Sequence, residues 1–448
     1  MNYTAYHVHT MKSLLDSTTS FEEYIDKALE CGMTAIGCSE HGLNREWAAN
    51  KLLCKSKIES INKKRAADGL RPLPPLKYLN GVEIYMTESL AEKKRDNFHT
   101  VLIAKNAEGQ KELFNLIQLS TRSDHVYYDN RITFDEFLGI SDNIIKISAC
   151  LASPLSKLPL EHPRYIELAQ HYDYLEIQHH NTQKQKEYNM LLWQLACQLD
   201  KPLIAGTDTH SLDKYHAECR EVLMEYKNQH YPDEEAFDLT WKTYDELVEA
   251  YRVQGVLPEE VFMEAIRNTN VMADSVEDIP IDTSIKYPIL YGSRENDSIK
   301  FTELIERKFT ENCEAGIIKP EQKEAFSTAM DEELRVFQKL HMDGFMLSMA
   351  ELIEFCRNNN IPVGPGRGSV SGSRIAYNVG IVDLNPEELN TVFSRFANEQ
   401  RVEIGDKHTC HPVWRHTDNK MVNQQKLGVQ NKSVLTVKPK AIAMVIPW

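Results

Sequence analysis

At 448 residues the chain is too long for one compact core, and this length predicts two or three domains. An apolar content of 42% and a charged content of 26%, without low-complexity tracts, exclude the disordered and fibrous classes. The formal net charge of −15 argues against indiscriminate coating of nucleic acid, but it leaves a DNA substrate open because a local basic groove can outweigh distant acids.

The first residues carry no basic stretch leading into an apolar one, and no run of eighteen apolar residues occurs, so we expect neither secretion nor a membrane span. Nine scattered cysteines without a Cys-x-x-Cys pair predict a reduced, cytoplasmic protein.

Short apolar runs alternate with longer amphipathic stretches, which is typical of βα units around a mainly parallel sheet. The first helix is expected between Ser20, where Glu23 completes a capping box, and Gly32. Seven strands alternating with helices predict a barrel-like (β/α)7 arrangement of about 210 residues, with an open doubly wound sheet as the alternative. The expected strands cover residues 5–9, 34–39, 78–84, 99–104, 144–149, 174–178 and 202–206, and further helices are expected at 46–67, 107–122 and 183–199.

Almost every expected strand begins or ends with a residue that can bind a metal ion. Each of these residues has an ordinary structural explanation when taken singly, but their recurrence at one edge of a barrel predicts a shared metal centre. Imidazole, carboxylate and thiolate ligands suit zinc or manganese better than magnesium, and adjacent ions favour phosphoester hydrolysis. The candidate ligands are His7, His9, Asp16, His41, Glu83, His99, Cys150, Asp208 and His210, and His179 and His180 follow the sixth strand.

A glycine-rich segment, Gly364 to Ser373, follows a short apolar run that we expect to be a strand, and an amphipathic stretch comes after it. Glycines allow close backbone approach, amides at a helix start attract phosphate, and Arg367 can clamp phosphate oxygens. The segment is not a Walker loop, because no Gly-Lys-Ser/Thr follows.

The metal-ligand motifs resemble those of the PHP (polymerase and histidinol phosphatase) domain, in the version found in bacterial replicative DNA polymerase III alpha subunits. The motifs that carry this resemblance are His7-Val8-His9-Thr10, Ser13-Leu14-Leu15-Asp16, Glu40-His41-Gly42, Gly81-Val82-Glu83, His99, Ser148-Ala149-Cys150-Leu151 and Asp208-Thr209-His210. Glu40 stands where the family usually has Asp, which casts little doubt because His41 supplies the expected ligand.

The resemblance implies an α/β fold with a distorted (β/α)7 barrel over residues 1–280 that holds up to three divalent ions, zinc or manganese rather than magnesium. Glu83 would bridge two of the ions, and Glu83 and Asp208 are the implied catalytic residues. The implied ligand sets are His7, His9, Glu83 and Asp208 for one ion, Glu83, His99 and Cys150 for a second, and Asp16, His41 and His210 for a third.

Four later motifs resemble the palm domain of the same polymerase family: His341 to Leu347, Gly364 to Ser373, Gly380 to Pro386 and Phe393 to Phe396. They imply a partial α+β palm domain of the DNA polymerase beta-like nucleotidyltransferase type over residues 286–406. The residues implied to bind nucleotide phosphates are Gly366, Arg367, Gly368, Ser369, Gly372 and Ser373.

Lys407-His408-Thr409-Cys410 stands where the family carries the Asp-x-Asp pair that holds two catalytic magnesium ions. We therefore expect no magnesium site in the palm and no templated nucleotide addition by this truncated chain. Residues 407–448 carry seven Lys or Arg against one acid, Asp418, in an otherwise acidic chain. They are expected to be an unrelated, disordered tail.

Together the two resemblances imply a DNA polymerase III alpha-like protein of bacterial or phage DNA replication. Its retained activity would be metal-dependent phosphoester hydrolysis of the 3′-to-5′ exonuclease type. The implied partners are DNA, as a single strand or primer end, a deoxynucleotide triphosphate by family only, and a replisome or proofreading-exonuclease subunit. A stand-alone small-molecule phosphatase of the histidinol-phosphatase type and a non-catalytic, metal-braced binding module are the alternatives.

Overall fold

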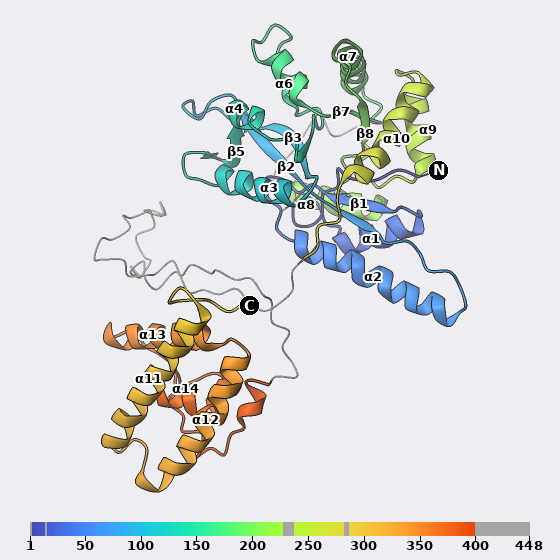
Figure 1. Cartoon of the computed structure of the whole chain (residues 1–448). Coiled ribbons are helices and arrows are strands. Elements are labelled where there is room, and N and C mark those ends of the chain that lie inside the picture. The colour runs from blue at the N-terminus through green and yellow to red at the C-terminus, as the bar shows by residue number, and fades with distance from the viewer. Residues whose placement is uncertain (1, 14–15, 227–236, 282–285, 399–448) are drawn as a thin grey trace. The chain divides into compact units, whose positions relative to one another are not determined.

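The computed structural model describes residues 2–13, 16–226, 237–281 and 286–398. The chain divides into two compact units, Met1–Ile281 and Asp282–Trp448 (Figure 1). The last part of the expected palm, 399–406, and the expected tail, 407–448, lie outside the described residues. No helix of the described residues is both long and apolar enough to cross a membrane.

The first unit mixes helices and strands along its whole length. Its elements are α1 (Phe21–Glu30), β1 (Ala35–Cys38), α2 (Trp47–Ala67), β2 (Lys77–Thr87), β3 (Phe98–Ala104), α3 (Ala107–Ser120), β4 (Val126–Tyr127), β5 (Asp129–Thr133), α4 (Phe134–Leu138), β6 (Ile144–Ile147), α5 (Pro154–Lys157), α6 (Tyr165–His171), β7 (Leu175–Gln178), α7 (Gln183–Leu199), β8 (Leu203–Gly206), α8 (Lys214–Tyr226), α9 (Tyr244–Gln254) and α10 (Glu259–Ser275). The capping box of Ser20 and Glu23 is present at the start of α1, and Gly32 follows the helix with a φ of 70°.

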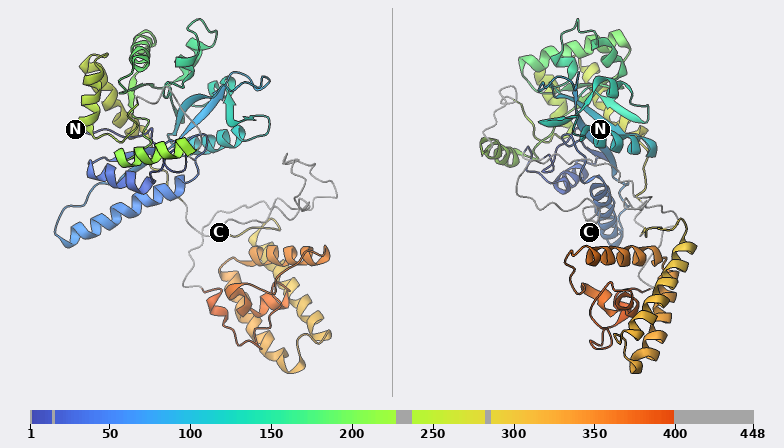
Figure 2. Two further views of the ribbon diagram at one scale, coloured as in Figure 1. Left: turned by 180° about the vertical axis from the view of Figure 1, so that it is seen from behind. Right: turned by 90° about the vertical axis from the view of Figure 1, so that its left-hand side faces the viewer.

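Strand pairing in the first unit runs round a closed circuit. β1 pairs with β2, β2 with β3, β3 with β6, and β7 with β8. Isolated bridges supply the other contacts: Ala5 to Ile36, Ile147 to Tyr174, and Val8 to Thr209. The chain near residues 5–9 therefore lies between β1 and the end of β8, and helices lie around the outside of the strands (Figure 2).

Three features of this sheet differ from the expectation. β3 runs antiparallel to both β2 and β6, because the connection between β2 and β3 is a short charged loop without the helix that a parallel crossover needs. The expected strand at 5–9 is an extended segment held by two isolated bridges. The short hairpin of β4 and β5 was not predicted, and β5 pairs in parallel with the last residues of β2.

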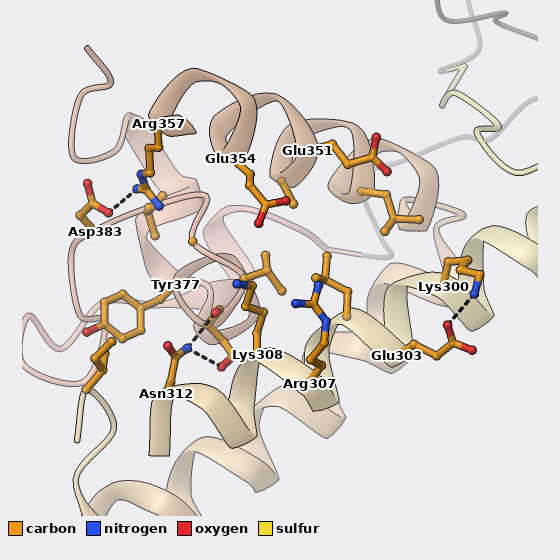
Figure 3. Close-up of a pocket in the computed structure, with 18 of the residues that line it drawn as sticks. Lys300, Glu303, Arg307, Lys308, Asn312, Glu351, Glu354, Arg357, Tyr377 and Asp383 are labelled. Atoms are coloured by element: carbon orange, nitrogen blue, oxygen red, sulfur yellow. Dashed lines mark hydrogen bonds and ion pairs between the residues drawn. The ribbon is translucent and has the colours of Figure 1, made fainter. Parts of the chain in front are cut away.

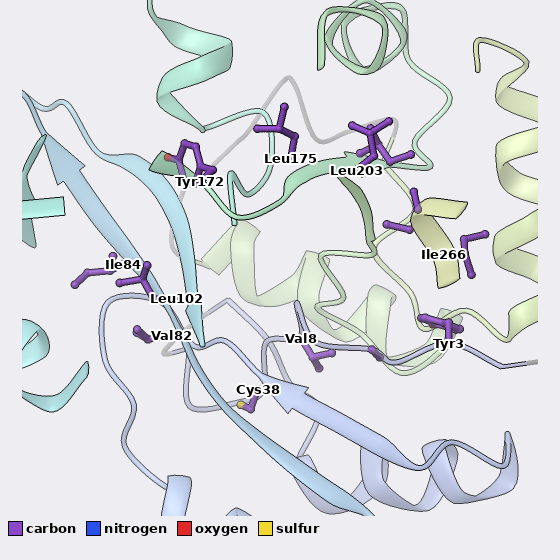
Figure 4. Close-up of a cluster of buried hydrophobic side chains, with 14 of the residues drawn as sticks. Tyr3, Val8, Cys38, Val82, Ile84, Leu102, Tyr172, Leu175, Leu203 and Ile266 are labelled. Atoms are coloured by element: carbon purple, nitrogen blue, oxygen red, sulfur yellow. The ribbon is translucent and has the colours of Figure 1, made fainter. Parts of the chain in front are cut away.

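Alternation along the strands separates an apolar face from a face that carries polar groups. Val82, Leu102 and Leu175 belong to the large core, which also contains side chains of the surrounding helices (Figure 4). Glu83 and Glu176 are the next residues along their strands, so their side chains point to the opposite face. The fold thus turns ionisable residues inward from several strands.

The second unit consists of helices and the loops between them, without a β-strand in its described residues, 286–398. Its elements are α11 (Arg294–Glu314), η1 (Pro320–Gln322), α12 (Lys323–Lys339), α13 (Asp343–Asn358), η2 (Gly368–Gly372), α14 (Arg374–Asn378) and η3 (Phe393–Arg395). Phe301, Phe337 and Met346 are fully buried in its separate core. The strand expected before Gly364 is not formed, because Pro362 and Pro365 lack backbone donors and no neighbouring strand lies in this described range.

Candidate metal centre

The buried carboxylate of Glu83 lies at the centre of a group of histidines. Its Oε1 is 2.9 Å from Nδ1 of His99 and 3.4 Å from Nε2 of His7. Its Oε2 is 2.7 Å from Nδ1 of His41 and 3.6 Å from Nε2 of His9. Strand β2 therefore delivers one acidic group that four imidazoles share.

Asp208 follows β8 and lies against two of the same histidines. Its Oδ1 lies 3.2 Å from Nε2 of His7 and 3.2 Å from Nε2 of His9. Its φ of 47° is in the left-handed region, which is unusual for a residue with a side chain and typical of strained functional positions. His210 donates from Nδ1 to the carbonyl oxygen of Asp208 at 2.8 Å, so its Nε2 carries a lone pair that can coordinate a metal ion.

Asp16 joins two histidines at the edge of the cluster. Its Oδ2 lies 2.9 Å from Nε2 of His41 and 3.4 Å from Nε2 of His210. Arg220 of α8 binds its other carboxylate oxygen at 2.7 Å and its backbone carbonyl at 2.8 Å. This arginine anchors the loop that carries Asp16, and the sequence analysis did not single it out.

Cys150 completes the group beside His99. Its Sγ is 3.7 Å from Nδ1 of His99 and 3.9 Å from Oε1 of Glu83. The structure thus brings all nine candidate ligands into one continuous cluster. Donor atoms lie within 4.8 Å of one another in three groups: His7, His9 and Glu83; His41, Glu83 and His99; and His9, His41 and His210.

Several of these buried atoms lack a hydrogen-bond partner in the described part of the chain. They are Nε2 of His7, Nε2 of His9, Nδ1 of His41 and Oε2 of Glu83. An unsatisfied buried polar atom is costly, so native proteins rarely leave several together. A divalent cation accepts lone pairs from imidazole nitrogen and carboxylate oxygen alike, so this donor set fits a metal ion.

The electrostatics of the cluster keep its carboxylates ionised. Burial acts to raise the pKa of Glu83, but the charges of His99 and His41 outweigh it and hold that pKa well below its usual value. The pKa of Asp208 is likewise lowered by His7, His9 and His210 against the effect of burial. Burial lowers the pKa of His9 to about 3, with His41 and His210 acting in the same direction, so this imidazole is neutral, as a ligand must be.

Burial also raises the pKa of the Cys150 thiol well above its usual value, and the neighbouring Asp208 and Glu83 raise it further. A nearby cation reverses this effect, because a metal ion stabilises the thiolate that coordinates it. Cys150 is therefore suited to binding an ion rather than to acting as a free nucleophile.

Two buried acids near the ligands have supporting contacts. Glu40 accepts hydrogen bonds from the backbone N–H of Thr10 at 3.1 Å and from the hydroxyl of Ser13, so its carboxylate braces the loop after His9. Glu176 of β7, which the sequence analysis missed, accepts from Nδ1 of His7 at 2.8 Å. The available signal was a glutamate in an otherwise apolar run between Leu175 and Ile177.

His179 and His180 are buried at the end of β7 but belong to none of the three donor groups. The ring of His180 stacks on Phe237 with 4.3 Å between centroids. Burial lowers the pKa of His180 to about 4, which keeps the ring neutral against this apolar neighbour.

The glycine-rich segment of the second unit has two different parts. Gly366, Arg367, Gly368 and Ser369 are exposed, whereas Gly372 and Ser373 are buried. Ser373 donates to Glu333 at 2.6 Å, and the backbone N–H groups of Arg374 and Ile375 donate to the same carboxylate. The start of α14 is thus already occupied by an acid of the protein, which a sequence reading of helix-start amides could not reveal.

A cavity of about 720 Å³ lies in the second unit between α11, α13 and α14 (Figure 3). Four basic and four acidic side chains line it, and pairs such as Lys300 with Glu303 and Arg357 with Asp383 neutralise one another. This balance gives the cavity no charge that would select a phosphate.

Comparison with known proteins agrees with both sets of motifs. The PHP domain family model matches residues 5–192, and the model of the bacterial DNA polymerase III alpha NTPase domain matches residues 300–408. A crystal structure from Bifidobacterium adolescentis, assigned as a metal-dependent phosphoesterase, gives a TM-score of 0.31 at 12% identity and covers 48% of this chain and 96% of that chain.

Curated relatives match the chain along most of its length. DNA polymerase III subunit alpha of Borreliella burgdorferi is 28% identical over 424 residues, covering 89% of this chain and 34% of that protein. The subunit of Aquifex aeolicus is 27% identical over 437 residues, covering 89% and 35%. The chain thus spans about a third of the length of these relatives. The chain is therefore similar to bacterial DNA polymerase III alpha subunits along most of its length, and it matches the models of the PHP domain and of the bacterial DNA polymerase III alpha NTPase domain.

Proposed function

We propose that the chain is a DNA polymerase III alpha-like protein of DNA replication, whose first unit is a (β/α)7 barrel of the PHP type that hydrolyses phosphoesters with divalent metal ions. One observation carries this proposal. Glu83 and eight other side chains that can bind metals, drawn from segments far apart in the sequence, lie in one cluster, and four histidines contact the buried carboxylate of Glu83. Apolar packing would stabilise the fold better than this group of buried ionisable residues, so the group indicates a function.

The residues divide into those that would hold ions and those that hold the ligands. The nine ligands would bind up to three ions, zinc or manganese rather than magnesium, because nitrogen and sulfur donors accompany the carboxylates. The ions would supply a hydroxide nucleophile near neutral pH and neutralise charge on the phosphoryl group. Glu83 and Asp208 are the proposed catalytic residues, since each lies against two or more of the histidines.

The proposed substrate is the 3′ end of a DNA strand, which the first unit would shorten as a 3′-to-5′ exonuclease. Similarity to DNA polymerase III alpha subunits supports DNA over a free metabolite. A replisome or proofreading-exonuclease subunit is the proposed protein partner. A small-molecule phosphatase of the histidinol-phosphatase type remains the second candidate because the PHP match alone is equally compatible with it.

We further propose that residues 286–406 form a partial palm of the DNA polymerase beta-like nucleotidyltransferase type. The NTPase match supports this assignment. Templated addition is expected to be absent, because Lys407-His408-Thr409-Cys410 replaces the Asp-x-Asp pair. Primer extension by the purified chain would contradict this expectation.

The decisive experiment offers the purified chain two substrates in parallel. A 5′-labelled single-stranded DNA and histidinol phosphate are incubated with Mn²⁺ or Zn²⁺, beside the Asp208→Ala variant and a control, Asp142→Ala, whose side chain is fully exposed. Shortening of DNA from its 3′ end, lost in Asp208→Ala and retained in Asp142→Ala, is the expected result.

Each other outcome selects a different function. Hydrolysis of histidinol phosphate alone would indicate a small-molecule phosphatase. Bound metal without hydrolysis of either substrate would indicate a metal-braced binding module. DNA shortening that survives unchanged in Asp208→Ala would show that another site is responsible.

A further inference from the structure

We propose that Glu176 is a positioning residue of the metal centre, which fixes the orientation and tautomer of His7, and that Gly206 is required because it leaves room for Glu176. The inference rests on the proposed metal site and extends it to two residues outside the ligand set. It concerns how tightly ions are held, so it can be tested without measuring hydrolysis.

The carboxylate of Glu176 is fully buried, and both of its oxygens have hydrogen-bond partners. Nδ1 of His7 lies 2.8 Å from its Oε1 and 3.1 Å from its Oε2. The hydroxyl of Tyr6 donates to Oε2 at 2.8 Å, and Nε2 of Gln178 donates to Oε1 at 2.8 Å. The backbone N–H of Glu176 donates to Ser148 at 2.8 Å, which ties this part of β7 to the end of β6.

These contacts determine which nitrogen of His7 faces the other ligands. A carboxylate only accepts hydrogen bonds, so Nδ1 of His7 must carry the proton that lies against Glu176. The lone pair of Nε2 is then directed at the cluster, where Nε2 lies 3.2 Å from Asp208 and has no hydrogen-bond partner in the described residues. A ligand histidine held through its other nitrogen by a carboxylate is both oriented and made more basic.

Each carboxylate oxygen of Glu176 also accepts a hydrogen bond from a residue other than His7. Tyr6 donates to Oε2 and Gln178 donates to Oε1, so rotation of the carboxylate away from His7 would break these two hydrogen bonds. Two other ligands are held similarly but by neutral acceptors: His9 by the hydroxyl of Ser13 and His210 by the carbonyl of Asp208. His7 differs from His9 and His210 because its second nitrogen is held by a group with a full negative charge.

Gly206 of β8 makes this arrangement sterically possible. A Cβ built at Gly206 would lie 2.2 Å from Cδ and 2.2 Å from Oε1 of Glu176, and 2.6 Å from its Cγ. β7 and β8 are paired strands, with Gln178 opposite Gly206, so the backbone of β8 cannot retreat without breaking that pairing. Any side chain at residue 206 would displace the carboxylate from His7.

The test measures metal affinity of the full-length chain by competition with a chromogenic chelator, using Zn²⁺ and Co²⁺. Glu176→Gln keeps the shape but removes the charge, Glu176→Ala removes both acceptors, and Gly206→Ala leaves Glu176 in the sequence but displaces it. Glu333→Gln is the matched control, because it makes the same change at a buried carboxylate of the second unit.

We expect Glu176→Ala and Gly206→Ala to weaken binding of the tightest ion by about 10- to 100-fold, with Glu176→Gln between these and the unsubstituted chain. The visible absorption of the Co²⁺ form should change in the same variants, which a loss of stability alone would not produce. Glu333→Gln should match the unsubstituted chain in both measurements.

A double-substitution cycle tests the link between the two residues. In the Glu176→Ala background there is room for a methyl group at residue 206, so adding Gly206→Ala should cost little further affinity, and the two effects should be far from additive. Full additivity would overturn the role assigned to Gly206.

Two failures remain distinguishable. Affinity and Co²⁺ absorption that are unchanged in Glu176→Gln and Glu176→Ala would overturn the positioning role and leave the metal site intact. An unsubstituted chain that binds neither ion would overturn the proposed function together with this inference. Should Gly206→Ala or Glu176→Ala fail to fold, Glu176→Gln against Glu333→Gln still decides.

Discussion

Oε2 of Glu83 lies 2.7 Å from Nδ1 of His41, yet neither atom forms a hydrogen bond among the described residues. Each of these atoms can offer a lone pair, and neither is satisfied by the other. Two neighbouring ligands of one cation would be arranged in this way. The same carboxylate has its other oxygen against His7 and His99.

Because Glu83 contacts histidines of several donor groups, removing its charge should affect more than one ion. We expect Glu83→Gln to lower the metal content of the dialysed protein by more than one ion per chain, as measured by elemental analysis. Glu92→Gln changes a mostly exposed carboxylate and should leave the content unchanged. A loss of one ion or none from Glu83→Gln would show that this residue does not bridge.

Removal of metal should destabilise the first unit alone. Each buried atom that an ion satisfies becomes costly when the ion leaves, and a ligand present at 100 times its Kd stabilises a fold by about 2.7 kcal/mol. A chelator should therefore lower the unfolding temperature of the first unit, as measured by differential scanning calorimetry with and without the chelator. The second unit, which has its own core, serves as the internal control, and an equal shift of both transitions would contradict this expectation.

The N-cap of α1 offers a test outside the metal site. Ser20 and Glu23 form a reciprocal capping box, in which each side chain accepts a hydrogen bond from the backbone N–H of the other. We expect Ser20→Ala to lower the free energy of unfolding of the first unit by about 1 kcal/mol in urea. Ser56→Ala, at an exposed position within α2, should be neutral or slightly stabilising because alanine is the better helix former.

Gly344, near the start of α13, should behave contrary to helix propensity. Replacing a helical glycine by alanine normally stabilises by up to about 1 kcal/mol. Here the new Cβ would lie 2.1 Å from the carbonyl oxygen of Pro288 and 2.5 Å from Oδ2 of Asp297. We therefore expect Gly344→Ala to destabilise the second unit by about 1–3 kcal/mol in urea unfolding.

Gly364→Ala is the control in the same unit, because nothing lies within 4 Å of the added atom. Its effect should stay within about 0.5 kcal/mol. If Gly344→Ala were stabilised, the backbone around Pro288 would have to move away from the added Cβ at little cost, which would contradict this prediction.

Local signals in the sequence located the elements well. The capping box marked the start of α1, and α7 was expected at 183–199, where it is found as Gln183–Leu199. Such features depend on residues close together in the chain, so they can be read without knowing the fold. The expected ligands also lie together, because strand ends that share an edge of a sheet meet in space.

What the sequence did not predict depends on distant partners. The antiparallel direction of β3 depends on its pairing with neighbouring strands in the sheet. Glu176 can bind His7 only when the fold brings β7 beside that histidine. Similarly, the start of α14 looked open to phosphate until Glu333 of α12 was found to occupy it. Contacts between residues far apart in the sequence, such as these, do not produce a periodic sequence pattern that could predict them.

The closure of the strand circuit by Val8 and Thr209 also determines when the centre can form. On the ribosome, His7 and His9 emerge long before the residues that must surround them, and domains fold as units while the chain is being made. The first ligands to be synthesised, His7 and His9, therefore reach their final positions only after the residues that follow β8 have been made. Loading with metal would therefore report that the strand circuit has closed, and a nascent chain stalled before β8 would lack a complete binding site.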